Sequence, residues 1–399
     1  MANLHKKRIM FLLPAMMAGG GEGFTVEAAT AVVRAGGVAL VGSSGGGMVT
    51  QLTAVGAHHC FVPFRWPRGH NGMIDGKRMS LRQWVTVLLA RICPPLLWWW
   101  LYKIVKAEKI DLLYASSRTP AWYGWLVARY LDIPFITGFH GIYSGHDFWP
   151  KKIYNSIMVR GDKIHAVSFF IQHHIESIYR IRRDKIAVIY GGVALPFFRV
   201  GGYDNASQQA VAAMTKNALL YLTHYHQPRV IFMPGRLAEW KAPDLLLSAF
   251  ASLLHERDDD HRLRDVVLLF QDIGKRSAYQ KLQEMIKKQR LVGRVGFLPQ
   301  LSAPQLLAAY DQARVVVNAS RRPEPFGRTV VEAMARKKMV IAPNHGAAVE
   351  QVNDGVNGFL FVAGDDLSLR RTLTRALALT DKQANSIGQA AQQTVRDKF

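Results

Sequence analysis

One stretch of the sequence, residues 315–350, constrains the fold of this chain more than any other. It opens with three consecutive valines at 315–317, passes through a turn that holds two prolines and Gly327, and continues as a helix-forming sequence from about Arg328. A short β-branched run bounded by turn residues predicts a buried strand. Proline keeps the turn extended, and glycine lets the backbone approach a ligand closely. The stretch therefore predicts a strand, a turn and a helix, the repeating unit of an α/β fold.

The start of this predicted helix is suited to anion binding. A helix N-terminus presents unpaired N–H groups and the positive end of the helix dipole, so Gly327, Arg328 and Thr329 are placed to cradle a phosphate. Glu324 precedes them, and Glu332 is expected two turns into the helix. One carboxylate can bind hydroxyls on one side of the phosphates, and the second can bind hydroxyls on the other side. Such a pair describes a nucleotide-sugar site, although two glutamates at this spacing also arise by chance.

Glu324 and Glu332 have seven residues between them, and this spacing resembles that of a known family. The resemblance is to the retaining nucleotide-sugar glycosyltransferases of family 4, which include sucrose, lipopolysaccharide-core and mannosyl transferases. It implies that Glu324 holds sugar hydroxyls, that Glu332 holds the ribose, and that Phe326 belongs to the donor site. Lys337 and Met339 stand where the family commonly has glycine and proline. Four further segments match the family in order and spacing, namely 332–335, 340–342, 346–350 and 354–360.

A pair of cations follows the strand predicted at 230–234. Taken alone, Arg236 and Lys241 describe an ordinary solvated surface. The segment 235–241 also matches the Gly-Arg-x4-Lys pattern of the resembled family, which implies that both cations grip the donor diphosphate. A leaving nucleoside diphosphate gains negative charge as the glycosidic bond breaks, so counter-charges at this point have a chemical purpose.

The first half opens with a predicted strand at 9–14, a glycine-rich segment at 19–23 and a predicted helix at 26–34. Strand, glycine turn and helix form an anion-binding arrangement, although such a turn can also be only a tight packing corner. In the resembled family this loop faces the transferred sugar and the acceptor, which implicates Gly20 and Gly21. Because three basic residues precede the apolar run, a signal peptide is the competing interpretation of the start of the chain.

His140 follows a strand predicted at 134–139. Open parallel sheets bind ligands at the carboxyl ends of their strands, although a single histidine is more often structural. The segment 137–141 extends the resemblance, in which a histidine at this point contacts the donor sugar or its phosphate. The resemblance thus gives a predicted catalytic set of His140, Glu324, Arg236 and Lys241.

Length and the alternation of predicted strands and helices divide the chain. At 399 residues it is too long for a single core. Strands alternate with helices in both halves, which predicts two doubly wound parallel sheets. The resemblance implies the GT-B fold, two Rossmann-like domains facing a cleft, with an acceptor-binding domain at 1–200 and a nucleotide-sugar domain at 201–399. The polar, irregular segment 199–228 is interpreted as the interdomain region.

Positive charge is unevenly distributed along the chain. The net charge is +22, of which +14 lies in residues 1–200, and such a surface attracts anionic partners. The segment 64–109 mixes cations with tryptophans, a combination that suits an anionic membrane surface. The alternative is a pair of core helices with a solvated basic face. Arg91 and the proline pair at 94–95 argue against a transmembrane helix here.

Together these features predict a retaining glycosyltransferase that moves a hexose from a nucleoside diphosphate sugar to an acceptor hydroxyl. Lipopolysaccharide, exopolysaccharide or another bacterial envelope glycan is the expected product. The expected partners are the nucleotide-sugar, a glycan or lipid-linked acceptor, and the cytoplasmic face of the inner membrane. Two cysteines, too few for a disulfide framework or a zinc site, agree with a reducing cytoplasm. No cofactor or metal is expected, because no Asp-x-Asp site must bind one and Arg236 and Lys241 supply the counter-charge.

Two alternatives stay open. One is another GT-B enzyme that acts on nucleotide-sugars, such as an epimerase or a phosphorylase-like enzyme, although no context marks a pyridoxal lysine. The other is a basic nucleic-acid-binding protein, but the chain lacks aromatic RNA-binding motifs, helix-turn-helix signs and zinc spacing, so no nucleic acid partner is expected. The sequence does not identify the donor base, the sugar or the acceptor. Residues 396–399 resemble the start of the family's returning last helix, which leaves the completeness of the C-terminus open.

Overall fold

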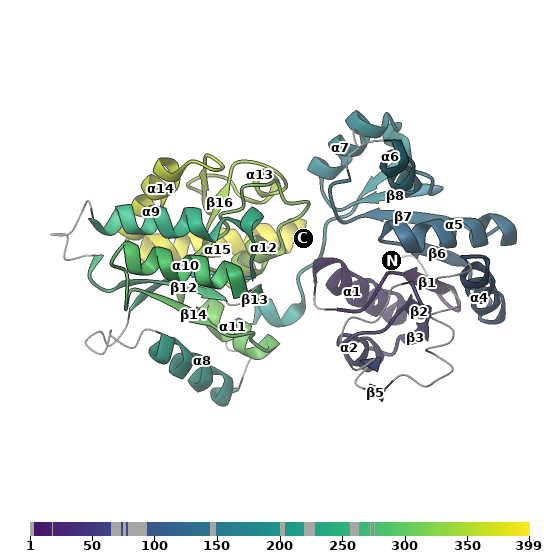
Figure 1. Cartoon of the computed structure of the whole chain (residues 1–399), viewed down its shortest axis with the longest axis horizontal. Helices are drawn as coiled ribbons and strands as arrows, with labels where there is room; N and C mark the ends of the chain where they lie inside the picture. The colour runs from purple at the N-terminus through teal and green to yellow at the C-terminus, as the bar shows by residue number, and fades with distance from the viewer. Residues whose placement is uncertain are drawn as a thin grey trace. The chain divides into compact units, whose positions relative to one another are not determined.

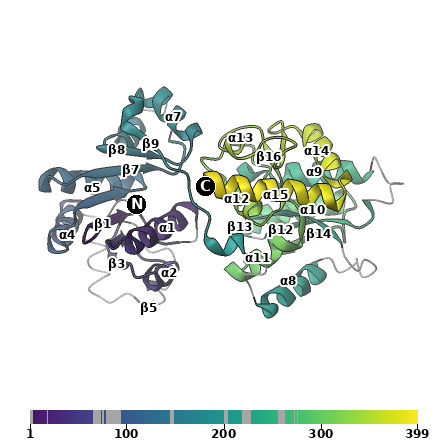
Figure 2. The same cartoon turned by 180° about the vertical axis from the view of Figure 1, so that it is seen from behind.

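The chain forms two compact units, Met1–Gly192 and Val193–Phe399, where the sequence placed a boundary after residue 200. Each unit is built on its own sheet with helices on both faces (Figure 1, Figure 2). Much of the tryptophan-rich segment predicted to face a membrane lies outside the described residues. The computed structural model describes residues 4–17, 19–64, 73–74, 77–78, 94–143, 149–199, 204–218, 228–255, 263–271, 273–274 and 276–399.

A seven-stranded parallel sheet forms the centre of the first unit. Its strand order reverses between β1 and β6, which is the doubly wound arrangement. The strand interpretation of residues 9–12 is confirmed, because β1 pairs in parallel with a neighbour on each side. In spatial order the strands are β3 (His58–Phe61), β2 (Val38–Ser43), β1 (Arg8–Leu12), β6 (Leu112–Ala115), β7 (Phe135–Phe139), β8 (Lys163–Ala166) and β9 (Ile186–Val188).

Successive side chains along β1 point to opposite faces of this sheet, and each face packs against different helices. Phe11 lies in one core cluster with the buried residues of α1 and α2. Leu12 faces α5, where Gly124 leaves room for it, since a Cβ at 124 would lie 2.7 Å from Leu12 Cδ1. The helices are α1 (Gly20–Arg34), α2 (Val49–Ala54), α4 (Pro94–Ala107), α5 (Arg118–Leu131), α6 (Trp149–Ser156) and α7 (Phe169–Tyr179). A separate antiparallel pair is formed by β4 (Met73–Ile74) and β5 (Lys77–Arg78).

The second unit repeats the doubly wound arrangement with six parallel strands, and its order reverses between β10 and β15. The prediction of two doubly wound α/β sheets is therefore confirmed. In spatial order the strands are β14 (Val295–Leu298), β12 (Val266–Gln271), β10 (Arg229–Met233), β15 (Ala313–Val317), β16 (Met339–Pro343) and β17 (Phe359–Phe361). A short parallel pair, β11 (Arg236–Leu237) and β13 (Ile273–Gly274), lies beyond the ends of β10 and β12.

Helices cover the two faces of the second sheet according to the same alternation. Ile231 and Met233 lie in the core cluster that includes α9, α10 and α14. Phe232 points to the opposite face, where its ring centroid lies 5.8 Å from that of Tyr310. The helices are α8 (Asn205–Ala218), α9 (Pro243–His255), α10 (Arg276–Lys288), α11 (Ala303–Gln312), α12 (Arg328–Ala335), α13 (Ala348–Gln351), α14 (Asp366–Ala378) and α15 (Asp381–Lys398).

The predicted glycine turn at 19–23 is wrong in form, because α1 already begins at Gly20. Gly19 is its extended N-terminal cap, and Glu22 stands in the first turn, where the helix dipole favours an acidic residue. Thr25 and Ala29 of the same helix are buried against the sheet. This packing outweighs the low helix propensity of glycine, which in the first turn is least costly because no intrahelical partner exists there.

The segment predicted as irregular at 199–228 contains a helix. Its composition is polar, but Val211 and Thr215, one turn apart, are buried, and α8 contacts α11 and β14. The Thr215 hydroxyl donates to Gln312 Oε1 at 3.1 Å. A stripe only one residue wide gives too weak a hydrophobic period to be read from the sequence.

Lys337 keeps the backbone conformation of the glycine that the resembled family commonly has at this position. Its φ is +59°, in the left-handed region that L-residues avoid. The turn after α12 therefore has the form that glycine favours, although lysine occupies it. Gly388 of α15 explains why the turn is closely packed, because a Cβ at 388 would collide with the Lys337 carbonyl.

Candidate functional site

The strand order of the second unit locates its ligand crevice. In a doubly wound sheet, ligands bind beyond the carboxyl ends of the strands where the order reverses. Here that point lies between β10 and β15. The loop after β10 holds Gly235, Arg236 and Lys241, and the loop after β15 leads through Glu324 to α12. The two segments singled out in the sequence thus meet at one crevice.

The start of α12 lies against the loop after β10. Gly327 caps the helix with φ +74°, and Gly235 has φ +100°, so both positions favour glycine. A Cβ at 235 would lie 4.0 Å from Thr329 Cγ2, which measures how close the two loops are. The Gly235 N–H donates to Gln271 Oε1 at 2.9 Å, so the loop is fixed from β12. The helix begins at Arg328 as predicted, and its first N–H groups face this crevice end.

Glu324 receives three hydrogen bonds on a single oxygen. Its Oε1 accepts from Lys241 Nζ at 2.6 Å, Asn318 Nδ2 at 2.8 Å and Ser320 Oγ at 2.5 Å. No described residue donates to Oε2. Burial alone would raise the pKa of this carboxyl, but the Lys241 charge and these hydrogen bonds together lower it. The structure therefore holds an ionised carboxylate with one oxygen saturated and one available as an acceptor.

The backbone of Glu324 is held from behind by the loop after β16. The Ala347 N–H donates to the Glu324 carbonyl at 3.0 Å. Gly346 has φ +63°, and a Cβ there would lie 2.7 Å from the Glu324 nitrogen. Only glycine permits this close approach. The segment 346–350, which matched the resembled family, thus has a clear structural purpose.

The two predicted cations differ in their surroundings. Lys241 ends a short 3-10 turn, its side chain is 12% exposed, and its Nζ lies 4.7 Å from the Trp240 ring centroid. Arg236 is exposed on β11, and its side chain makes no ion pair with the described residues. The structure therefore gives Lys241 a protein carboxylate as its partner and leaves the guanidinium of Arg236 open to an anion.

Glu332 lies little more than one turn into α12, not two. Its Oε2 accepts from the Tyr310 hydroxyl at 3.0 Å, and its Oε1 lies 3.3 Å from Arg328 Nε. Burial raises the pKa of Glu332, although Arg328 and the Tyr310 hydroxyl oppose this effect. The two motif carboxylates thus have pKa values displaced in opposite directions, with Glu324 the more readily ionised.

Phe326 turns its side chain away from open space. It is 7% exposed, and its ring centroid lies 5.8 Å from that of Phe399. Its carbonyl accepts a hydrogen bond from Gln351 Nε2. The ring therefore packs the end of α15 onto the turn before α12. Of Phe326, only the backbone is left to contact a ligand at the predicted donor site.

In the first unit, Gly20 and Gly21 are the first residues of α1. Among the described residues, no atom beyond the chain neighbours and the backbone of the helix itself lies within 4 Å of a Cβ placed at Gly21. The α1 N-terminus follows β1, one of the two strands at which the order of this sheet reverses. Anion binding at this position stays a prediction, now with helical N–H groups in place of a glycine turn.

His140 directly follows β7 and is linked to two other buried rings. The Tyr114 hydroxyl on β6 lies 2.8 Å from His140 Nε2 and 2.8 Å from His165 Nδ1 on β8. Burial, and secondarily the neighbouring His165, lower the pKa of His140 to about 3. His140 is therefore a neutral imidazole at physiological pH.

Both halves of the chain match known glycosyltransferase families. Residues 221–394 match the family described as Glycosyl transferases group 1, and residues 18–196 match the one described as Glycosyltransferase Family 4. Over most of its length the chain is therefore similar to the group 1 and family 4 glycosyltransferases. These matches cover the β10 and β15 loops of the second unit, and in the first unit the α1 start and His140.

One relative and one solved structure agree with these family matches. The D-inositol 3-phosphate glycosyltransferase of Corynebacterium diphtheriae is 30% identical over 294 residues, which are 71% of this chain and 66% of that protein. The aligned part is therefore less than two thirds of that relative. A glycosyltransferase from Rickettsia africae, known from a crystal structure, is 28% identical in sequence and has a TM-score of 0.76. The match covers 99% of this chain and 94% of the Rickettsia chain.

A further structural neighbour supports the GT-B fold of this chain. The Anabaena protein HepE, in complex with UDP and glucose, has a TM-score of 0.77 and 22% identity, with coverage of 98% and 95%. At this identity the likeness concerns the fold alone. The GT-B fold expected from the sequence is confirmed by these neighbours.

The described residues contain neither a metal-binding cluster nor a membrane-spanning helix. Within those residues, no three His, Cys, Asp or Glu side chains are grouped so that they could hold a metal ion. The same part of the chain has no helix with the length and apolar character needed to span a membrane. The acidic run at 258–260 lies outside the described residues.

Several residues of the candidate site were not predicted from the sequence. Asn318 and Ser320 immediately follow β15, so polar residues at a strand end were the available signal. Tyr310 precedes Glu332 by 22 residues on another helix, and Tyr114 and His165 are 51 residues apart. No local pattern connects these residues, because their contacts exist only once neighbouring elements are paired.

Proposed function

We propose that this chain is a retaining glycosyltransferase that moves a hexose from a nucleoside diphosphate sugar to an acceptor hydroxyl. The observation that carries the proposal is the state of Glu324. Three donors fix Oε1, while Oε2 receives none from the described residues, beside a helix start suited to phosphate. A fixed, ionised oxygen is an acceptor for sugar hydroxyls, and the neighbouring N–H groups suit the diphosphate.

The proposed chemistry needs counter-charge more than it needs a nucleophile. When the bond from the sugar C1 to the diphosphate oxygen breaks, its electron pair remains on the diphosphate. Arg236, Lys241 and the N–H groups of α12 stabilise this developing charge. The acceptor oxygen attacks C1 from the face that the diphosphate leaves, and its proton passes to the departing oxygen. Configuration at C1 is retained.

Glu332 has a different proposed role, the binding of the ribose hydroxyls. Both of its oxygens already have protein partners, Tyr310 and Arg328. Each oxygen still has acceptor capacity, because a carboxylate oxygen has two lone pairs. The partners fix the orientation of the carboxylate, which favours a positional role over a chemical one.

Release of nucleoside diphosphate from a panel of UDP-, GDP- and ADP-sugars tests this function. The wild-type protein should cleave at least one donor slowly even when water replaces the acceptor. Early proton spectra of the released sugar should have the anomeric configuration of the donor. Glu324→Gln should reduce the rate about 10²-fold or more, while Glu350→Gln on α13 serves as a control. Inversion at C1, or no cleavage of any donor, would contradict the proposal.

We further propose that the reaction needs no metal ion, since Arg236 and Lys241 provide positive charge at the diphosphate. EDTA should leave the rate of the best donor unchanged. A loss of rate in EDTA that magnesium or manganese restores would contradict metal independence without contradicting the transfer itself.

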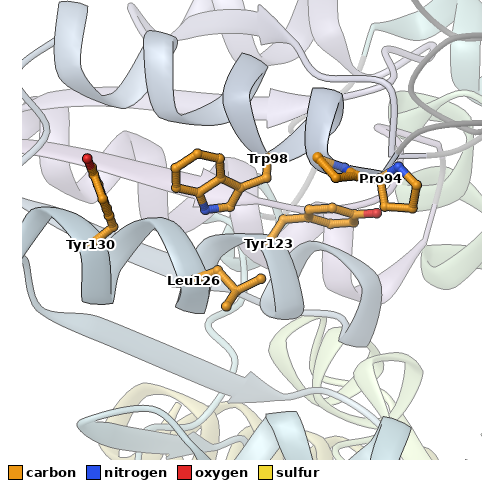
Figure 3. A pocket seen from close by; sticks show the side chains of 6 residues that line it. Pro94, Trp98, Tyr123, Leu126 and Tyr130 are labelled. Atoms are coloured by element: carbon orange, nitrogen blue, oxygen red, sulfur yellow. The ribbon is translucent and has the colours of Figure 1, made fainter.

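The proposed acceptor is a glycan or lipid-linked hydroxyl of a bacterial envelope, met at the cytoplasmic face of the inner membrane. The supporting feature is an apolar groove of about 460 Å³ between α4 and α5. Figure 3 shows the Trp98 ring between the two helices, above Tyr123 and Leu126. Trp99 and Tyr130 beside it are 49% and 67% exposed. The lining residues are Pro94, Pro95, Trp98, Tyr123, Leu126 and Tyr130.

Charge beside the groove favours an anionic membrane over a neutral partner. Lys103 Nζ lies 5.2 Å from the Trp99 ring centroid, and Lys106 Nζ lies 5.7 Å from that of Tyr102. Neither α4 nor α5 contains an acidic residue. Cations held over aromatic rings that are at least partly exposed suit the head-group region, where both groups are stabilised. Trp100 has a separate, structural task, since its Nε1 donates to the Phe61 carbonyl at 3.1 Å.

Sedimentation with phosphatidylglycerol vesicles tests the membrane proposal. The wild-type protein should sediment at low salt and be partly released at high salt, because the electrostatic part is screened. The double variant Trp98→Ser/Trp99→Ser should bind much more weakly. Trp125→Ser on another face of α5 is the matched control, since it also removes an indole beside a cation, Arg160. Equal binding of the double variant, or no sedimentation of wild type, would contradict this proposal.

A further inference from the structure

Three rings form a hydrogen-bonded chain across neighbouring strands of the first sheet. Tyr114 on β6 is the centre, with His140 Nε2 and His165 Nδ1 each 2.8 Å from its hydroxyl oxygen. The other nitrogen of His165, Nε2, lies 2.7 Å from the Ile189 carbonyl oxygen. Tyr114 and His165 are 7% and 4% exposed. The chain therefore runs from a backbone carbonyl to His140, at the carboxyl end of the sheet.

The backbone carbonyl determines where every proton in this chain lies. A carbonyl can only accept, so His165 Nε2 must carry a hydrogen. His165 is neutral, because burial lowers its pKa, so its Nδ1 has no hydrogen and needs a donor. The Tyr114 hydroxyl is that donor, and its oxygen is then left to accept from His140 Nε2–H. His140 Nδ1 is consequently a bare acceptor, and no described residue donates to it.

The neighbouring strand and helix pack closely against these three rings. A Cβ at Gly138 on β7 would collide with the Tyr114 hydroxyl and lie 2.9 Å from His140 Nε2, so glycine is what lets the two groups meet. Phe24 of α1 covers the rings, with centroids 4.6 Å from His140 and 5.1 Å from His165. Gly138 belongs to the 137–141 segment that resembles the family, and its close contact with these rings explains why glycine stands at this position.

We infer that Tyr114 and His165 are positioning residues that fix His140 as the neutral Nε2–H tautomer, so that its Nδ1 accepts a hydroxyl of the transferred sugar. This inference rests on the proposed function for the identity of the hydroxyl. A neutral acceptor suits a sugar that gains positive charge as the diphosphate leaves, whereas an imidazolium would repel it. An imidazole carrying its proton on Nδ1 would present a donor and could not accept the hydroxyl at that atom.

Nitrogen-15 spectra of the ligand-free protein, labelled at histidine, test the proton positions without any substrate. His140 should have a protonated Nε2 and an unprotonated Nδ1 at pH 7, and its Nε2 proton should exchange slowly with solvent. Tyr114→Phe, which removes only the hydroxyl, should make this proton exchange rapidly. Tyr179→Phe is the matched control, because its hydroxyl also donates a hydrogen bond in this unit, to the Tyr143 carbonyl, but does not contact Tyr114, His140 or His165 in the described structure. A wild-type His140 protonated on Nδ1, or charged, overturns the inference.

Kinetics with the best nucleotide-sugar of the panel test the role of the hydrogen bonds that join Tyr114, His140 and His165. Tyr114→Phe should lower kcat/KM roughly tenfold, the loss expected for one well-placed hydrogen bond. Its affinity for the nucleoside diphosphate alone should stay unchanged, because Arg236, Lys241 and α12 bind that part. Tyr179→Phe should keep both values. An unchanged kcat/KM in Tyr114→Phe, or an equal loss of nucleoside diphosphate affinity, overturns the positioning role. Absence of turnover in wild type contradicts the proposed function instead, and the spectra still decide the tautomer.

Discussion

Lys241 Nζ lies 2.6 Å from Glu324 Oε1, which joins the two motifs of the second unit into one ion pair. The side chains are 12% and 13% exposed, so the pair is largely removed from water. An ammonium has three donors, and the pair uses one of them. Lys241 can therefore hold Glu324 in place and still offer hydrogen bonds to a diphosphate.

Because of this pair, Lys241→Ala should affect both turnover and stability. Turnover should fall about 10²-fold or more, since one counter-charge is lost. The free energy of unfolding should fall by about 3 kcal/mol, at the low end for breaking a buried pair, because Asn318 and Ser320 still bind Glu324. Urea unfolding and donor cleavage measure the two effects.

The double variant Lys241→Ala/Glu324→Gln separates these effects. It should recover part of the lost stability, because no unpaired buried charge remains, and it should stay inactive. Additive stability losses in this double-mutant cycle would show that the two side chains are not coupled. Activity regained together with stability would show that Lys241 acts only through the fold.

The opposite pKa displacements of Glu324 and Glu332 predict opposite pH dependences of stability. The folded pKa of Glu324 lies below its ordinary 4.5, so its contribution is present above 4.5 and is lost as pH falls through the folded pKa. The folded pKa of Glu332 lies above 4.5, so stability is lost as pH rises from 4.5 through that value. Relative to wild type, the stability of Glu324→Gln should therefore increase toward low pH, and the stability of Glu332→Gln should increase toward high pH.

Urea unfolding of both glutamine variants at several pH values from 3 to 8 measures this contrast. Each variant is the control for the other, because both replace a largely buried motif carboxylate by an amide of the same size. Differences from wild type that ran in the same direction with pH would contradict the pKa assignment of one carboxylate.

Replacement of Arg336, which the proposed reaction does not use, should have a large effect on stability. Its side chain is 1% exposed, its Nε donates to Asp311 Oδ1 at 2.9 Å, and its Nη1 donates to the Pro196 and Arg199 carbonyls. Arg336→Met removes these hydrogen bonds and the buried ion pair with Asp311, and it should reduce the free energy of unfolding by about 3 to 5 kcal/mol. Arg375→Ala, which breaks an exposed pair with Asp354, should cost less than about 1 kcal/mol. Equal losses in the two variants would contradict this ranking.

Strands and their order of appearance were largely predictable from the sequence. Each β-branched run ends at glycine, proline or a small polar residue, as at 315–317, and this punctuation is local. The α12 start was predicted at its observed residue because Gly327 requires the left-handed conformation there. The start of α1 was placed too late, at residue 26 instead of Gly20, because burial of Thr25 and Ala29 outweighs the low helix propensity of the glycines.

Residue partners in the site were less predictable than residue positions. The sequence, with its family resemblance, gave Lys241 and Glu324 as members of one site, but not their ion pair across 83 residues. It gave His140 without Tyr114 and His165, since these meet only when three strands are aligned in register. Spacing along a chain determines which elements form, whereas hydrogen bonds between elements follow from the packed sheet.

Binding of UDP, GDP and ADP, followed by titration calorimetry without metal, tests the central claim most directly. The claim is that the crevice between β10 and β15 binds a nucleoside diphosphate with Arg236 as its open cation. At least one of the three should bind, and Arg236→Ala should weaken it about tenfold or more, the loss expected for a charge-assisted hydrogen bond. Arg290→Ala at the end of α10 should bind as wild type does. Binding of none of them, or equal binding by Arg236→Ala, would contradict the account.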